Sequence, residues 1–199
     1  MFSFNSLDIQ GNIFYFKNCI SEPDRYISFL EDNDNNILSY QSIEKWKPWY
    51  ASDDKNTLYG KQKRVSNFLN TSDDFTNKRN LYLINSINDG FYMCTKYYCE
   101  NHRITNFFIQ KEFVINKYTS SIGMGAHIDA YSKEINNTYT ILFYLNNDYE
   151  NGEIEFPDEK ITIKPEKGSI LIFPANYTHI AHPVSSGVKY FALSQFFEQ

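Results

Sequence analysis

The chain has 199 residues, 42% of them hydrophobic and 18% aromatic, which is enough for one sizeable domain with a full core. The formal net charge of −5 and the isoelectric point near 5.4 argue against a general nucleic-acid binder, which needs a basic face. No apolar stretch is long enough to span a bilayer, and the first residues do not resemble a signal peptide, so we expect a soluble, cytoplasmic protein.

The first half of the chain carries one strand signal and two helix signals. Residues 11–16, "GNIFYF", predict a strand. Ser21 is a candidate cap for a short helix over the following residues. An apolar stripe at three- and four-residue steps predicts a helix from Asp74 to Cys99, and the Asp89-Gly90 pair predicts a break within it.

Residues 40–65 have no clear period and contain both tryptophans, Trp46 and Trp49. Two interpretations stay open for this segment. A long irregular stretch in a compact domain is often a lid or a binding loop. The alternative is a surface loop held in place by two buried indole rings.

After Glu112 the pattern changes to strands. Short segments rich in β-branched and aromatic residues alternate with turn residues, which predicts an antiparallel sandwich or barrel. The segments are "EFVINKYT", "TYTILFYLN", "GEIEFP", "ITIK", "SILIFP" and "VKYFALSQFF". We therefore expect one domain over residues 1–199, with helical support and a substrate loop in 1–110 and the β core in 111–199.

The cysteines give no sign of a zinc site or of a disulfide framework. They are three in number, Cys19, Cys94 and Cys99, and their spacings match neither pattern. We expect reduced thiols, as in a reducing compartment.

The stretch "GMGAHIDAY" places His127 two residues before Asp129, so in a strand both side chains project from one face. Two imidazoles and one carboxylate with three open positions form the facial triad of non-haem Fe(II) oxygenases. A structural zinc site would instead close its fourth position and usually include thiolates. By itself His-x-Asp is a common chance pattern, and a polar turn with a core histidine remains an alternative. The candidates for the further imidazole are His102, His179 and His182.

Residues 118–197 resemble the double-stranded β-helix of the Fe(II)- and 2-oxoglutarate-dependent dioxygenases, most of all the prolyl 4-hydroxylase branch. Four features carry the resemblance, in the family's order: Tyr118 before "HID", the strand "TYTILFYLNND", the turn "NGEIEFP", and the segment "PEKGSILIFPANYTHIAHPVSSGVKY". The resemblance implies a mainly β fold with flanking helices and a jelly-roll, cupin-like core. One departure is the end of the last strand, "SQFFEQ", where the family often has a tryptophan.

The resemblance also implies a set of site residues. His179 stands four residues before Pro183 and ten before Lys189, as the distal iron ligand does in the family, whereas His182 fits neither interval. The implied Fe(II) ligands are thus His127, Asp129 and His179. Lys189 is expected to pair with the far carboxylate of 2-oxoglutarate. The other residues expected at the co-substrate are Tyr118, Tyr144, Thr140 and Ile154, which replaces a threonine.

The activity implied by the resemblance is O2-dependent hydroxylation of prolyl residues in a peptide or protein, with release of succinate and CO2. Ascorbate is a further candidate cofactor. The aromatic residues expected to clamp an extended peptide are Trp46, Trp49, Tyr50 and Tyr59. Two alternatives remain: the same chemistry on a free amino acid or another small molecule, and a non-catalytic jelly-roll module that binds metal. Neither a nucleic-acid nor a membrane partner is expected.

Overall fold

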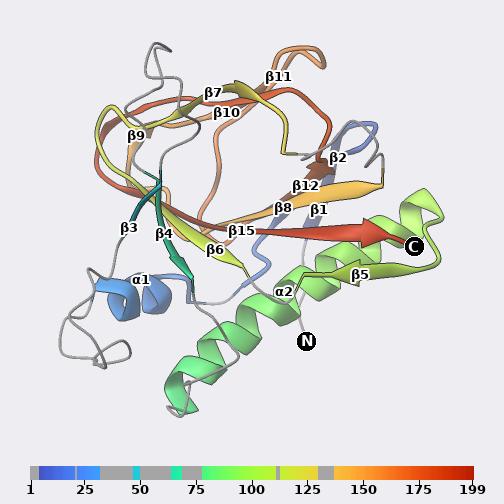
Figure 1. The fold of residues 1–199 in the computed structure, drawn as a ribbon, viewed down its shortest axis with the longest axis horizontal. Coiled ribbons are helices and arrows are strands. Elements are labelled where there is room, and N and C mark those ends of the chain that lie inside the picture. Colours follow the sequence, from blue (N-terminus) through green and yellow to red (C-terminus); the bar gives the residue numbers. More distant parts are fainter. Residues whose placement is uncertain are drawn as a thin grey trace.

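The structure, a computed structural model, describes residues 5–20, 22–31, 47–49, 64–68, 78–110, 113–129 and 137–199. Two β-sheets face each other, and a long helix lies across the outer face of the larger sheet (Figure 1). This is the double-stranded β-helix architecture expected from the sequence.

The large sheet has nine strands, and each of its strand pairs is antiparallel. In spatial order its strands are β1 (Asn5–Gln10), β2 (Ile13–Lys17), β12 (Ile170–Pro174), β8 (Thr138–Tyr144), β15 (Lys189–Glu198), β6 (Val114–Tyr118), β4 (Arg64–Phe68) and β3 (Lys47–Trp49), with β5 (Phe107–Ile109) paired to β15.

The small sheet faces the inner side of the large one. Its four strands, in spatial order, are β11 (Ile161–Ile163), β10 (Ile154–Phe156), β13 (His179–Ala181) and β7 (Met124–His127). A separate two-stranded ladder joins β14 (Val184–Ser186) to β9 (Glu150–Asn151).

The central strands of the large sheet are buried on both faces, which explains their nearly continuous apolar sequences. On β8, Ile141 and Phe143 belong to the core beneath the long helix. Leu142 and Tyr144 belong to a second core between the two sheets. Successive side chains of a strand point to opposite faces, so one short segment contributes to both cores.

The described helices are α1 (Asp24–Glu31) and α2 (Lys78–His102). The break predicted at Asp89-Gly90 is wrong, because α2 runs through it for 25 residues. A Cβ atom on Gly90 would lie 2.9 Å from Cδ1 of Ile20. Glycine is therefore present because the helix passes close to Ile20 at this point. Among the described helices, none is both long and apolar enough to cross a membrane.

The six strands expected after residue 112 are present as β6, β8, β10, β11, β12 and β15. The strand expected at residues 11–16 is one arm of the β1–β2 hairpin. The first half of the chain is not only helical support, since β2 pairs with β12 and β4 pairs with β6. Within residues 40–65, the described positions form β3 and the beginning of β4. The three cysteines are buried free thiols, as expected.

Candidate metal centre

The small sheet brings His127, Asp129 and His179 together. His127 ends β7, His179 begins β13, and the two residues are direct partners across the antiparallel pair. Their ring centroids lie 4.1 Å apart. Asp129 follows β7, with Oδ1 3.4 Å from His127 Nε2 and Oδ2 3.6 Å from His179 Nε2. The potential ligand atoms of the three residues lie within 4.8 Å of one another, which is close enough to share one metal ion.

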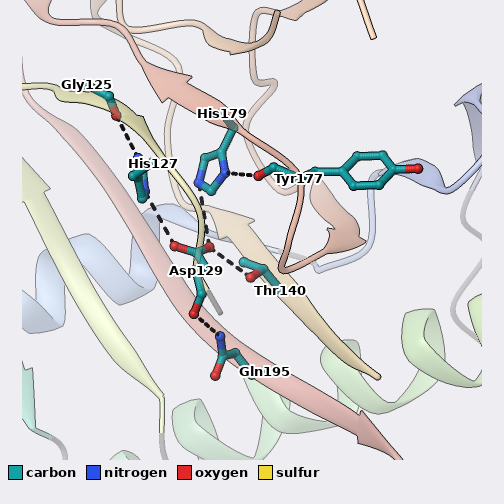
Figure 2. A network of polar contacts seen from close by, with 7 residues as sticks. All are labelled: Gly125, His127, Asp129, Thr140, Tyr177, His179 and Gln195. Atoms are coloured by element: carbon teal, nitrogen blue, oxygen red, sulfur yellow. Dashed lines mark hydrogen bonds and ion pairs between the residues drawn. The ribbon is translucent and has the colours of Figure 1, made fainter. Parts of the chain in front are cut away.

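Both imidazole rings are oriented by the backbone (Figure 2). His127 Nδ1 lies 2.7 Å from the carbonyl oxygen of Gly125, and His179 Nδ1 lies 3.0 Å from that of Tyr177. A carbonyl can only accept a hydrogen bond, so each ring donates through Nδ1–H. In the neutral ring, the form that binds a metal ion, the lone pair is then on Nε2, which points toward Asp129 in both residues. Hydrogen bonds of this type fix the tautomer of metal-ligating histidines.

Asp129 is held as a carboxylate. Burial acts to raise its pKa. When the rings are protonated on Nε2 as well, the hydrogen bond with His127 and the charges of His179 and His127, together with the hydrogen bond from Thr140, outweigh burial and lower the pKa to about 2. The Thr140 hydroxyl donates to Oδ2 at 2.8 Å. At neutral pH the residue therefore has the ionised form that metal coordination requires.

A pocket is lined by these three side chains and by Lys189. Four residues expected at the co-substrate line it: Tyr118, Tyr144, Ile154 and Lys189. Most of the remaining wall is apolar and consists of Met124, Leu142, Ala181, Phe191 and Leu193. The three potential metal ligands and Lys189 therefore line the same pocket, and the rest of its wall is mostly apolar.

Lys189 is buried in this cavity, with 2% of its surface exposed. Its ammonium group donates a hydrogen bond to the carbonyl oxygen of Gly152 at 2.6 Å, and the Tyr144 ring centroid lies 5.2 Å from Nζ. Burial lowers the pKa of Lys189 to about 7, although the charge of Glu153 acts to raise it. The ion pairs formed among the described residues do not include Lys189.

The Tyr144 hydroxyl adds a second polar group to the Lys189 end of the pocket. It is fully buried and has no hydrogen-bond partner within the described part of the chain. A buried, unsatisfied hydroxyl is costly. A ligand oxygen between the hydroxyl and the ammonium group would satisfy both, and an anionic one would also compensate the charge of the lysine.

Other residues singled out from the sequence lie outside the pocket. Thr140 does not line it and instead contacts Asp129. His182 Nε2 is 2.7 Å from Glu155 Oε2, away from the triad. His102 ends α2 and stacks on Tyr98, with 4.1 Å between ring centroids.

The residues expected to clamp a peptide are Trp46, Trp49, Tyr50 and Tyr59. Trp46, Tyr50 and Tyr59 lie outside the described residues, and Trp49 is the last residue of β3. The sequence reasoning missed Phe191 and Leu193 as pocket residues. Both follow Lys189 at two-residue steps along β15, and this alternation would have placed them on the same face.

Comparison with known proteins gives a family match over the segment that contains the site. Residues 113–198 match the family model of the 2OG-Fe(II) oxygenase superfamily. No curated protein sequence matches the chain.

Three solved structures share the fold. A truncated viral collagen prolyl hydroxylase, vCPH, from Paramecium Bursaria Chlorella virus-1 has 17% identity and a TM-score of 0.59, over 100% of this chain and 98% of that one. A Trichoplax adhaerens prolyl hydroxylase in complex with a hypoxia inducible factor peptide fragment has 17% identity and a TM-score of 0.63, over 94% and 84%. The non-heme alpha ketoglutarate dependent epimerase SnoN from nogalamycin biosynthesis has 11% identity and a TM-score of 0.64, over 94% and 78%.

At these identities the structural likeness establishes the fold, and the family model covers the segment with His127, Asp129, His179 and Lys189. Residues 113–198 are therefore the part of the chain that is similar to the 2OG-Fe(II) oxygenase superfamily.

Proposed function

We propose that the protein is an Fe(II)- and 2-oxoglutarate-dependent hydroxylase acting on prolyl residues of a peptide or protein. The observation that carries the proposal is one pocket with a His-Asp-His cluster at one end and a buried lysine at the other. The lysine has no carboxylate partner among the described residues. The pocket therefore has the two features that a metal-chelating dicarboxylate requires.

The residues fit Fe(II). Nε2 of His127 and His179 and the carboxylate of Asp129 form the two-histidine, one-carboxylate donor set that leaves three positions open. No cysteine takes part in the cluster, so a closed structural zinc site is disfavoured. When bound, the iron would supply the activation of O2 that protein side chains cannot provide. The three side chains would hold the ion, and the mostly apolar pocket wall would limit access of water to it.

The residues also fit 2-oxoglutarate. Lys189 and the Tyr144 hydroxyl would bind the carboxylate far from the metal. Among the described residues Lys189 has no anionic partner, and the Tyr144 hydroxyl has no hydrogen-bond partner. Leu142 and Ile154 would pack against the methylene groups. Tyr118 is the third polar residue expected here, and it lines the same pocket.

A prolyl substrate is supported by two observations. The pocket wall includes Met124, Ala181 and Leu193, which suit an apolar ring better than a charged side chain. Two of the similar structures are named prolyl hydroxylases. The similarity to SnoN, a named epimerase, favours a second candidate, the same cofactor chemistry on a small molecule. Use of ascorbate stays a prediction.

The first test is spectroscopic and catalytic. Anaerobic addition of Fe(II) and 2-oxoglutarate should give a weak visible charge-transfer band. After O2 is admitted, 2-oxoglutarate should be converted to succinate and CO2, and proline-rich peptides should gain one oxygen atom on proline by mass spectrometry. Succinate without peptide oxidation would favour a small-molecule substrate. Neither band nor succinate would indicate a binding module and contradict the proposal.

A pair of histidine variants tests the ligand assignment. Mn(II) can serve as a substitute for Fe(II) in binding measurements. His179→Ala should abolish Mn(II) binding and Fe(II)-dependent turnover, because it removes one of the three proposed ligands. His182→Ala is the matched control, since His182 lies three residues away and pairs with Glu155 instead. The reverse result would show that the distal ligand is wrongly assigned.

A further inference from the structure

Asp129 lies where the two sheets meet. It follows β7 of the small sheet, yet its backbone N–H donates a hydrogen bond at 2.8 Å to the carbonyl oxygen of Ala175, directly after β12 of the large sheet. The carboxylate of the triad is therefore attached to the large sheet, whereas both histidines are held by the small one. The relative position of the three ligands depends on this attachment.

Two further residues of the large sheet contact Asp129 (Figure 2). Thr140 on β8 and Gln195 on β15 are directly opposite each other in the antiparallel pair. The Thr140 hydroxyl donates to Oδ2 of Asp129 at 2.8 Å. The side-chain amide of Gln195 donates to the backbone carbonyl oxygen of Asp129 at 3.3 Å. One cross-strand pair thus holds both the side chain and the main chain of the same residue.

Both donors are buried. Thr140 has no exposed surface and Gln195 has 9%. A hydrogen bond to a charged acceptor is stronger than one between neutral groups, and low water access strengthens it further. Neither residue lines the pocket. The polar groups of both side chains instead make the hydrogen bonds to Asp129.

We propose that Thr140 and Gln195 are positioning residues for the metal ligand Asp129. The Thr140 hydroxyl engages Oδ2 and leaves Oδ1 as the oxygen available to the ion, while Gln195 fixes the backbone that carries the carboxylate. A carboxylate that binds through both oxygens takes two coordination positions, and one that binds through a single oxygen takes one. The Thr140 contact thereby helps to keep three positions open for the co-substrate and O2. This inference rests on the proposed function.

A neighbouring residue provides a matched control. Thr138 is also on β8, two residues before Thr140, and is buried with 3% exposed. Its hydroxyl has no hydrogen-bond partner within the described residues. Thr138→Val and Thr140→Val are therefore the same chemical change on the same strand, but only the second removes a contact to Asp129.

The experiment measures Mn(II) affinity of the full chain by electron paramagnetic resonance, and the visible spectrum of the Co(II)-loaded protein. Thr140→Val should raise the dissociation constant for Mn(II) about 10- to 100-fold, the usual effect of losing a partner of a metal ligand, and should alter the Co(II) bands. Thr140→Ser should restore both, and Thr138→Val should match the wild type. Gln195→Leu should weaken Mn(II) binding in the same direction.

Four outcomes have distinct meanings. If the wild type does not bind Mn(II), the proposed function fails and this inference fails with it. If the wild type binds and Thr140→Val has the same affinity and Co(II) spectrum, only the positioning role is wrong. Equal losses in Thr140→Val and Thr138→Val would assign the effect to core packing and also overturn it. If Thr140→Val does not fold, as judged by circular dichroism without metal, Thr140→Ala carries the same expectation.

Discussion

Lys189 has a charge state that depends on what occupies the pocket. Burial lowers its pKa to about 7, with the charge of Glu153 opposing the shift. A bound carboxylate would favour the ammonium form and raise the pKa again. In the ligand-free protein the folded-state pKa lies below that of an unfolded lysine, about 10.4. The unfolded chain then binds more protons between these two values, so this residue makes the free energy of unfolding increase with pH from about 7 to about 10.

Replacing Lys189 tests both consequences. Lys189→Met should raise the dissociation constant for 2-oxoglutarate about 30-fold or more, because truncating one partner of a buried charge pair costs about 2–5 kcal/mol. The increase in ligand-free stability between pH 7 and pH 10 should disappear as well. Calorimetric titration of the Mn(II)-loaded protein and urea unfolding at several pH values measure the two effects. The exposed Lys164 provides the control Lys164→Met, and unchanged 2-oxoglutarate affinity in Lys189→Met would disprove the role of the lysine.

At the scale of elements, the site depends on how β7 and β13 approach each other. A Cβ atom on Gly123, directly before β7, would lie 2.6 Å from the carbonyl oxygen of Ala181 and 2.7 Å from the nitrogen of Pro183. Both are backbone atoms, so they cannot move aside as the end of a side chain can. The absence of a side chain at Gly123 thus permits the pairing that brings His127 opposite His179.

A methyl group at Gly123 should alter the position of the metal-ligating histidines, although Gly123 itself is not a metal ligand. Gly123→Ala should lower the free energy of unfolding by about 1–3 kcal/mol, as overpacking does elsewhere, and should weaken Mn(II) binding. Chemical denaturation and Mn(II) titration measure these changes, with Ala126→Ser at an exposed position of β7 as the control. If Gly123→Ala matched the wild type in both, the close approach of the strands would not determine the geometry of the site.

At the scale of the whole molecule, the residues proposed to bind the metal ion and 2-oxoglutarate come from both sheets. The histidines belong to the small sheet, whereas Lys189 and Tyr144 belong to the large one. Asp129 is bonded to the large sheet through Ala175, Thr140 and Gln195. A metal ion and a dicarboxylate together would therefore add contacts across the space between the sheets, and any ligand that binds only the folded state stabilises it.

Mn(II) and 2-oxoglutarate together should raise the melting temperature more than either does alone. At about 100 times the dissociation constant a ligand adds about 2.7 kcal/mol, which corresponds to roughly 5–10 °C for a chain of this size. Differential scanning calorimetry measures the shift, and a chelator should reverse it. The increment due to 2-oxoglutarate should be missing in Lys189→Met. A melting temperature that does not respond to saturating Mn(II) and 2-oxoglutarate would contradict the proposed function.

The sequence by itself determined the β core and the polar residues that line the pocket. The later strands were predictable because alternation of side chains is a local property of the chain. The order of His127, Asp129, His179 and Lys189 was recognisable because it follows a family pattern. Short strands with little local signal, such as β5, β9 and β14, were not predicted, since they form only through pairing with distant segments.

Only the tertiary structure decided what several of these residues contact. Thr140 was predicted to line the pocket because it shares a strand face with Tyr144. In the structure, Asp129 lies close enough to the large sheet for the Thr140 hydroxyl to donate to its carboxylate instead. Gly90 was read as a helix break, whereas it permits close packing of α2 on Ile20. Both outcomes depend on distances between elements far apart in the chain, and such distances are set by the packing of the two sheets and the helix.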